Sequence, residues 1–310
     1  MSSGLALLFP GQGSQSVGMA RDLVARYDVA RAVFEEADDV LGFALGRLCF
    51  EGPQEELTRT ENAQPALVAA GTAVARVVES ELGLTPTWAA GHSLGEFSAL
   101  VCAGSLTFAD ALHVVRERGR AMQEAVPVGV GAMAAIIGLE LAEVDQVCRE
   151  AAADEVVSPA NLNGGGQIVI AGHAAAVDRA ATLAKERGAR RALRLDVSAP
   201  FHCALMAPAA ERLRAALAPI PFAPLRFPVF SNVEARAYPG PDRVADLLVR
   251  QVTEPVRWQE SVEALAGAGC ELAVESGPGK VLSGLVRRIA PSIRCLPGEN
   301  PELLREQLEG

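Results

Sequence analysis

The sequence has few aromatic residues and no long uninterrupted hydrophobic run. Aromatic residues make up 5% of the 310 positions. A membrane-spanning helix needs about 18 consecutive apolar residues, and the nearest candidate, residues 125–139, is interrupted by one proline and three glycines. No basic residue precedes the short apolar run Leu5–Phe9, which argues against a secretory signal. We therefore expect no membrane span and a cytoplasmic location.

Cysteines with metal-binding spacing are also absent. The six cysteines are scattered without a C-x-x-C motif, which is typical of free thiols rather than of a disulfide framework or a zinc cluster. Acidic residues outnumber basic ones by 38 to 28, for a formal net charge of -10. Binding to nucleic acid requires a cationic surface. The composition therefore argues against nucleic acid as a partner, and any acidic partner needs a local basic patch.

The N-terminal part alternates strands and helices. Leu5–Phe9 reads as a buried strand, and Pro65–Leu82 as a helix with proline in its first turn. Thr87–Ala90 reads as a second strand, which a tight turn joins to a helix that ends near Ala103. Strand, turn and helix in this order are typical of an α/β layer. With 310 residues, the chain is also long enough for a second core.

A different pattern occupies residues 127–197. We predict four strands and two helices, in the order β-α-β-β-α-β: Ala132–Leu139, helix Leu141–Ala152, Val156–Ala160, Gln167–Ala171, helix Ala174–Arg187 and Arg191–Val197. This order is the split βαβ of ferredoxin-like folds. We therefore predict a small inserted domain, with a large α/β domain made of residues 1–126 and 198–310.

The turn after the second strand, Gly91-His92-Ser93-Leu94-Gly95, matches the G-x-S-x-G nucleophile elbow. Side chains at the two glycine positions would clash in so tight a turn. The first N–H groups of the following helix have no partner within the helix, so they can bind negative charge beside the serine. Ser93 is therefore a candidate nucleophile, with an ordinary Gly/Ser turn as the alternative.

A nucleophilic serine needs a base, and the chain has four histidines. His92 adjoins the serine and should point away from it, His113 lies within a helix, and His173 follows a turn of the small domain. His202 follows the return from the inserted domain, in the Pro-bounded loop Ser198–His202, where catalytic groups tend to lie. We favour His202 as the base, and a structural histidine is the alternative.

The helix predicted over residues 108–125 carries one arginine with an unusual surrounding. Arg116 and Arg120 have polar or charged helical neighbours, whereas Arg118 is framed by Val114, Val115, Ala121 and Met122. A half-buried guanidinium needs an anion or several hydrogen bonds. We interpret Arg118 as a bidentate clamp for a substrate carboxylate, with an internal salt bridge as the alternative.

Several further segments complete a pattern that extends over nearly the whole chain. In order they are FPGQGSQSVGM, QPAL, GHSLGE, RGRAMQEAVP, NLNGGGQIVIAGH, APFHCALMAP, RQVTEPVRW and ESGPGKVLSGL. Together they resemble the malonyl-CoA:acyl-carrier-protein transacylase family of fatty acid synthesis, which includes the acyltransferase domains of polyketide synthases. So many matches in the same order are far more specific than the elbow alone.

The resemblance implies an α/β-hydrolase-like large domain with a ferredoxin-like small domain, in agreement with the pattern above. It also implies a role for each matching residue. These are Ser93 as nucleophile, His202 as base, Arg118 as the malonyl carboxylate clamp, the backbone carbonyl of Gln251 as the group that orients the histidine, and the backbone N–H groups of Gln12 and Leu94 as the oxyanion hole. Met122 and Phe201 are expected in the acyl pocket. Phenylalanine before the histidine is common in polyketide-type relatives that select malonyl over methylmalonyl.

The implied reaction is ping-pong transfer of malonyl from malonyl-CoA to the phosphopantetheine thiol of acyl carrier protein. It requires no metal and no cofactor of the enzyme's own, and we expect a monomer. Carrier proteins of this pathway are acidic, so docking needs local cations. The adjacent pairs Arg190-Arg191 and Arg287-Arg288 are candidates for this surface.

Three rival functions remain. An ordinary α/β-hydrolase esterase places its histidine near the C-terminus, whereas the last histidine here, His202, lies 108 residues before the end. A non-catalytic subunit that binds the carrier protein would have no reason to keep Ser93, His202 and Arg118 together. A discrete acyltransferase of a polyketide or malonate decarboxylase system would use the same residues, so the sequence does not separate it from the fatty acid enzyme.

Overall fold

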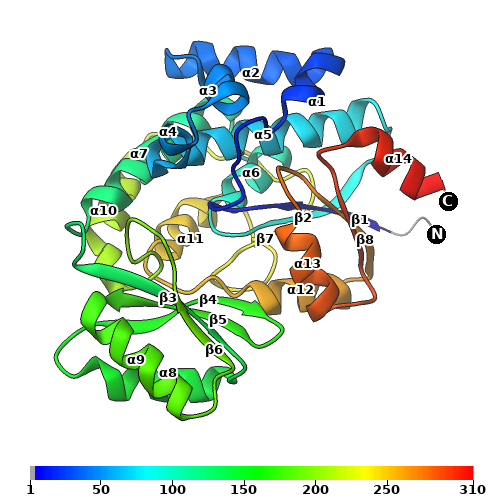
Figure 1. Cartoon of the computed structure of the whole chain (residues 1–310). Helices are drawn as coiled ribbons and strands as arrows, with labels where there is room; N and C mark the ends of the chain where they lie inside the picture. The colour runs from blue at the N-terminus through cyan, green and yellow to red at the C-terminus, as the bar shows by residue number, and fades with distance from the viewer. Residues whose placement is uncertain (1–3, 310) are drawn as a thin grey trace.

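A five-stranded parallel sheet organises the larger part of the molecule, in a computed structural model that describes residues 4–309 (Figure 1). The strand order is β7-β2-β1-β8-β9, and every neighbouring pair is parallel. The strands are β1 (Gly4–Phe9), β2 (Pro86–Gly91), β7 (Val229–Phe230), β8 (Cys270–Glu275) and β9 (Arg294–Pro297). Parallel strands are expected to be covered on both faces, and the helices provide this cover.

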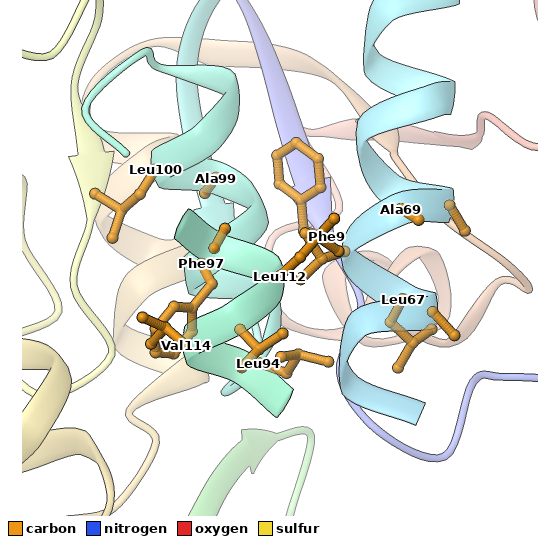
Figure 2. Close-up of a cluster of buried hydrophobic side chains, with 14 of the residues drawn as sticks. Phe9, Leu67, Ala69, Leu94, Phe97, Ala99, Leu100, Leu112 and Val114 are labelled. Atoms are coloured by element: carbon orange, nitrogen blue, oxygen red, sulfur yellow. The ribbon is translucent and has the colours of Figure 1, made fainter. Parts of the chain in front are cut away.

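The residues of β1 alternate between two apolar layers. Leu7 and Phe9 pack in the cluster that contains the helices of residues 60–124, whereas Ala6 and Leu8 pack against those of residues 258–289. Figure 2 shows the first layer, where Phe9 meets side chains such as Leu94 and Leu112. The helices of this part are α1 (Arg21–Arg26), α2 (Asp28–Leu41), α3 (Leu45–Glu51), α4 (Gln54–Thr58), α5 (Thr60–Ser80), α6 (Gly95–Cys102), α7 (Phe108–Glu124), α10 (Ala207–Leu217), α11 (Val244–Gln251), α12 (Trp258–Gly267), α13 (Val281–Ile289) and α14 (Pro301–Glu309).

The smaller part is an antiparallel sheet with the order β4-β5-β3-β6. Its elements are β3 (Gly131–Ile137), α8 (Leu141–Ala152), β4 (Val157–Gly164), β5 (Gln167–His173), α9 (Ala174–Glu186) and β6 (Arg191–Arg194). This is the β-α-β-β-α-β order that the sequence predicts. Ala134 and Ile136 of β3 pack under α8 and α9, while Met133 and Ala135 join the core of the larger part. One face of the small sheet is therefore covered by α8 and α9, and the other face packs against the core of the larger part.

Some local predictions were wrong. The long helix begins at Thr60, so Pro65 lies in its second turn and not in its first. There the proline lacks the N–H that would bond to the carbonyl of Glu61, in the first turn of the helix. The last strand of the small sheet ends at Arg194 and not at Val197, because the chain then turns away towards His202. The helices α1 to α4, in residues 21–58, were not predicted. The domain boundaries at residues 126/127 and 197/198 stay a prediction.

The cysteines are free thiols, as predicted. Five of the six are buried, and Cys295 is partly exposed. Among residues 4–309, no helix is long and apolar enough to cross a membrane.

Candidate active site

Ser93 lies in a tight turn between the end of β2 and the start of α6, with its backbone in the left-handed region at φ 50°. A Cβ atom on Gly91 would lie 1.9 Å from the carbonyl carbon of Gly95. A Cβ atom on Gly95 would lie 2.0 Å from the carbonyl oxygen of Phe9. Real Cβ atoms do not approach other atoms so closely, so the clash expected at both glycines is confirmed. The turn packs directly on the end of β1.

His202 faces this serine from the loop that follows β6. Its Nε2 lies 2.7 Å from Ser93 Oγ, and its Nδ1 lies 2.7 Å from the main-chain carbonyl oxygen of Gln251, the last residue of α11. A carbonyl only accepts hydrogen bonds, so Nδ1 carries the proton. Nε2 is then free to accept the proton of the serine hydroxyl.

The charge state of His202 suits a base. The side chain is only 3% exposed. Burial and, to a smaller extent, the nearby charge of Arg118 lower the pKa of His202 to about 3, against the hydrogen bond to Gln251. The imidazole is therefore neutral at neutral pH.

Arg118 is the third side chain at this centre, and it is fully buried, so the prediction of a half-buried guanidinium was wrong. Its Nη2 donates to Ser93 Oγ at 3.2 Å and to Gln251 Oε1 at 2.9 Å, and its Nη1 donates to Gln64 Oε1 at 2.9 Å. The helical neighbours of Arg118 are apolar. Its acceptors instead come from α5, from α11 and from the serine turn. Burial lowers the pKa of Arg118 to about 10, so the side chain stays cationic at neutral pH.

A close helix contact brings Gln64 to Arg118. A Cβ atom on Gly119 would lie 2.7 Å from the carbonyl oxygen of Thr60, so α7 packs directly on the first turn of α5. Within residues 4–309, the buried Nε of Arg118 has no hydrogen-bond acceptor. The Nε donor of the guanidinium is therefore not used by the chain itself.

Asn232, on the loop after β7, holds the serine turn in place. Its Oδ1 accepts the N–H of Ser93 at 2.7 Å, and its Nδ2 donates to the carbonyl oxygen of Gly91 at 2.6 Å. The side chain is completely buried. Sequence reasoning assigned no role to Asn232, which lies outside every motif quoted above. It also assigned none to Gln64 and Glu96, although both lie within motifs, in QPAL and GHSLGE.

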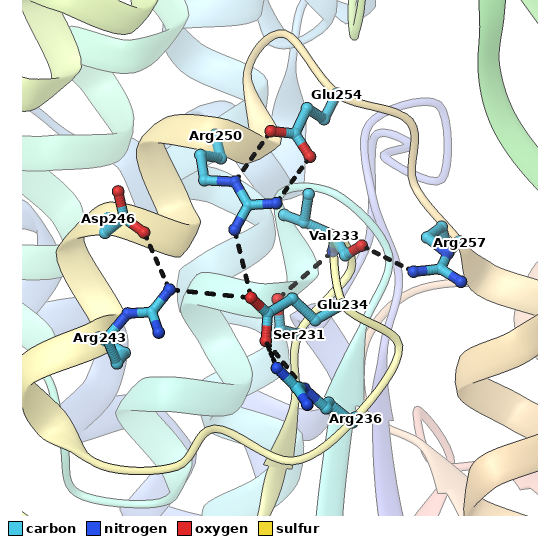
Figure 3. A network of polar contacts seen from close by, with 9 residues as sticks. All are labelled: Ser231, Val233, Glu234, Arg236, Arg243, Asp246, Arg250, Glu254 and Arg257. Carbon is cyan, nitrogen blue, oxygen red and sulfur yellow. Dashed lines mark hydrogen bonds and ion pairs between the residues drawn. The ribbon is translucent and has the colours of Figure 1, made fainter.

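An ion-pair network ties the loop of Asn232 to the helix of Gln251 (Figure 3). Glu234, two residues after Asn232, accepts from Arg236 at 2.8 Å and from Arg250 at 3.2 Å. Arg250 also pairs with Glu254. The two residues that contact Ser93 from this side are thereby fixed relative to each other.

The loop after β1 lies against the serine turn. A Cβ atom on Gly11 would lie 2.6 Å from the carbonyl oxygen of His92, which places Gln12 beside the turn. Within the described residues, neither the backbone N–H of Gln12 nor that of Leu94 donates to an acceptor of the chain. Both groups are available to an oxygen that approaches Ser93.

The remaining histidines have other contacts. His92 Nε2 lies 2.8 Å from Asn163 Oδ1, away from the serine hydroxyl. His173 Nδ1 accepts the N–H of Val156 at 2.9 Å, which is a structural role. His113 is exposed on α7.

The two residues expected in the acyl pocket are buried. Met122 is 1% exposed, and its sulfur lies 3.9 Å from Nε2 of Gln64, the partner of Arg118. Phe201 directly precedes His202 and is also buried. Met122 therefore contacts a partner of Arg118, and Phe201 is the chain neighbour of His202.

The four arginines considered for docking are all exposed, and in the described part of the chain none of them forms an ion pair: Arg190, Arg191, Arg287 and Arg288. Two of them approach the turn between β4 and β5. The Nε of Arg190 would lie 2.9 Å from a Cβ on Gly138, and that of Arg288 would lie 3.0 Å from a Cβ on Gly165. Gly138 donates to Gly166 at 2.8 Å, so the two arginines flank the same turn.

A groove of about 520 Å³ lies next to this turn. Its lining includes Gln12 and His92 from the region of the serine turn, Asn161 and Asn163 of β4, and the cationic Lys280 and Arg288. It connects the loop beside Ser93 with the exposed cations.

Comparison with known proteins places this geometry in a family. The model of the acyl transferase domain matches residues 6–289. The chain belongs to the acyl transferase family. It is 50% identical over 304 residues to the malonyl CoA-acyl carrier protein transacylase of Escherichia coli (strain K12), and the alignment covers 98% of each chain.

Solved structures of family members have the same fold. The malonyl CoA-acyl carrier protein transacylase of Coxiella burnetii superposes with a TM-score of 0.97 at 43% identity, covering 99% of this chain and 97% of that chain. A malonyl-transacylase solved in complex with a type II PKS acyl-carrier protein gives a TM-score of 0.95 at 46% identity, covering 99% and 100%. The α/β fold with a parallel sheet and a separate antiparallel sheet, predicted from the sequence, is thus confirmed.

Proposed function

We propose that this acyl transferase moves the malonyl group of malonyl-CoA to the phosphopantetheine thiol of an acyl carrier protein, and so supplies fatty acid elongation. The observation that carries the proposal is the buried Arg118 guanidinium, 3.2 Å from the hydroxyl oxygen of Ser93. A cation at this place favours an acyl group that ends in a carboxylate. The similarity to curated malonyl transacylases supports the same substrate.

In the first half-reaction, Ser93 Oγ attacks the thioester carbonyl of malonyl-CoA while His202 Nε2 takes the hydroxyl proton. The carbonyl oxygen becomes an oxyanion, and the N–H groups of Gln12 and Leu94 stabilise it. The C–S bond then breaks, and His202 gives its proton to the departing sulfur, so that CoA leaves as the free thiol and His202 is neutral again. The product is a malonyl ester of Ser93.

In the second half-reaction, the phosphopantetheine thiol of the carrier attacks this ester. His202 takes the thiol proton and gives it to Ser93 Oγ as the ester bond breaks. Arg118 holds the malonyl carboxylate through both steps, with Met122 and Phe201 beside the acyl chain. The carrier is acidic, and the exposed Arg190, Arg191, Arg287 and Arg288 supply its docking surface. We expect the chain to act as a monomer in the cytoplasm.

The test is the intact mass of the purified protein after incubation with malonyl-CoA, beside a Ser93→Ala variant and an acetyl-CoA control. We expect a malonyl adduct on the wild type alone, discharged by phosphopantetheinylated carrier protein. Accumulation of free malonate without an adduct would favour the esterase function. Absence of both adduct and malonate would favour a non-catalytic subunit.

A second candidate carrier is that of a type II polyketide system. One solved relative, at 46% identity, was captured with such a carrier. The serine chemistry is the same in both cases, so the discharge step decides between them. Rates measured with a fatty acid carrier and with a polyketide carrier, at equal concentrations, show which one this chain prefers.

A further inference from the structure

Glu96 is a wholly buried carboxylate close behind the catalytic centre. It lies on α6, three residues after Ser93, and its side chain has no exposed surface. Its Oε1 accepts from the hydroxyl of Tyr238, and its Oε2 accepts from Gln251 Nε2 at 2.6 Å and from the N–H of Asn232 at 3.1 Å. All three donors are neutral. Within residues 4–309, no arginine, lysine or histidine contacts this carboxylate directly.

Arg118 is in the complementary situation. It is a buried cation, and in the described chain its acceptors are two glutamine side chains and the serine hydroxyl, with no carboxylate among them. A buried charge is costly unless an opposite charge is near. The structure therefore holds one buried anion and one buried cation that do not touch.

The side chain of Gln251 connects the two charges. Its Nε2 donates to Glu96 and also to the carbonyl oxygen of Ser93 at 2.9 Å, and its Oε1 accepts from Arg118. A carboxylate and a carbonyl only accept, and a guanidinium only donates. The amide of Gln251 can therefore satisfy its neighbours in one orientation only, with its dipole aligned between the two charges.

We propose that the ionised Glu96 is the counter-charge of Arg118, acting through the Gln251 carboxamide, and that it limits how tightly the site holds a substrate carboxylate. A direct ion pair would occupy the guanidinium permanently. The glutamine spacer stabilises the cation but leaves the Nε of Arg118 unpaired. Glu96 also repels the incoming carboxylate across the buried site, which keeps the acyl group releasable to the carrier. Glu96 is a positioning residue, and the inference rests on the proposed role of Arg118.

The experiment measures equilibrium binding of malonyl-CoA and acetyl-CoA by calorimetry, in a Ser93→Ala background that cannot be acylated. Glu96→Gln removes the charge and can keep the hydrogen bonds, because its amide oxygen can face Gln251 and Asn232. We expect it to tighten malonyl-CoA roughly tenfold and to change acetyl-CoA by less than about twofold. Unchanged or weaker malonyl-CoA binding, relative to acetyl-CoA, would overturn the proposal.

Two control variants separate the possible explanations. Measured at pH 9, Tyr238→Phe removes one hydrogen bond from Glu96 and leaves its carboxylate charged, so a purely structural role predicts that it acts like Glu96→Gln. We expect it to change both affinities in parallel. Arg118→Ala should abolish the preference for malonyl-CoA over acetyl-CoA. If it does not, the proposed role of Arg118 itself is wrong.

A titration of the same protein avoids the risk that Glu96→Gln fails to fold. Burial raises the pKa of Glu96 to about 7, against its hydrogen bonds and the charge of Arg118. The other titratable groups that face it are Tyr238, whose pKa burial raises, and Arg118, whose pKa burial lowers to about 10, so neither titrates between pH 6 and 8. We expect the preference for malonyl-CoA to increase severalfold from pH 8 to pH 6. A preference that does not change with pH would contradict the proposal.

Discussion

The imidazole of His202 is oriented by the main chain of Gln251, whose carbonyl oxygen lies 2.7 Å from Nδ1. The side chain of the same residue instead contacts Arg118 and Glu96. One residue thus contacts the proposed base with its backbone and the proposed carboxylate clamp with its side chain. These two contributions are separable by substitution.

Replacing Gln251 with alanine should therefore spare the base and damage the clamp. The carbonyl that holds His202 remains, while Arg118 loses a hydrogen bond to a charged group, worth about 1.5–3 kcal/mol. We expect malonyl transfer to fall on the order of 10- to 100-fold, and labelling of Ser93 by an uncharged fluorophosphonate to fall much less. Equal losses in the two assays would show that the side chain also supports the base.

Arg118→Lys should lose substrate selection while keeping the positive charge. Lysine cannot reproduce the planar fork that reaches Ser93, Gln64 and Gln251 at once. We expect the ratio of malonyl to acetyl loading on Ser93, measured by intact mass, to fall at least tenfold. A ratio that stays at the wild-type value would mean that charge alone selects the substrate.

The acid limb of serine reactivity should lie far below the usual histidine range. The pKa of His202 is lowered to about 3 by burial, with a contribution from Arg118. Protonation removes the base, so labelling of Ser93 should stay nearly constant from pH 8 to about 5. Removing the cation in Arg118→Ala raises the pKa of His202, so the limb should move to higher pH. A wild-type limb centred near 6.5 would contradict this prediction.

Gly95→Ala should destabilise the fold. Its Cβ would lie 2.0 Å from the carbonyl oxygen of Phe9, a backbone atom that cannot move without shifting β1. We expect a loss of about 1–3 kcal/mol or more, seen as a lower melting temperature. Gly267→Ala is the matched control, because no atom lies within 4 Å of its Cβ and its helical conformation suits alanine. It should leave stability unchanged or slightly higher.

Charge reversal at Arg287 and Arg288 should weaken the carrier half-reaction. Both residues lie exposed on α13. We expect the KM for carrier protein to rise roughly tenfold, with a smaller effect on loading from malonyl-CoA. The double variant Arg31→Glu/Arg47→Glu, at two exposed arginines on α2 and α3, changes the net charge equally and is the control. An unchanged carrier half-reaction would remove this pair from the docking surface.

The sequence predicts those parts of the site that depend on local chain geometry. The serine turn is specified within five residues, and Ser93 and His202 meet as expected. The sequence does not predict the hydrogen-bond partners of Arg118 and Ser93. Gln64 lies 54 positions from Arg118, and Asn232 lies 139 positions from Ser93. No short-range pattern records such contacts, and only the family resemblance indicated the carbonyl of Gln251.

The same distinction applies to the fold. The first two strands of the large sheet, the long helices α5 and α7 and the whole small sheet have clear apolar patterns, and these elements were predicted in the right order. No element after residue 197 was predicted, nor was the 14-residue helix α2. The helices α1, α3 and α4 have six, seven and five residues, too few to establish a helical period. The burial of Arg118 was underestimated because only its own helix was considered.

The burial of the cysteines affects how they can react with the thioesters that pass through this site. Malonyl thioesters enter this site, so the thiolate of a reactive cysteine nearby would attack the thioester carbonyl, release CoA and take the malonyl group in place of Ser93. Cys203 directly follows His202, yet it is 1% exposed and its sulfur donates to the carbonyl oxygen of Pro200. Burial raises the pKa of Cys203 to about 11, so the thiolate that would attack is scarce at neutral pH. Cys203 thus leaves the malonyl group to Ser93, although its thiol is adjacent in the chain to His202.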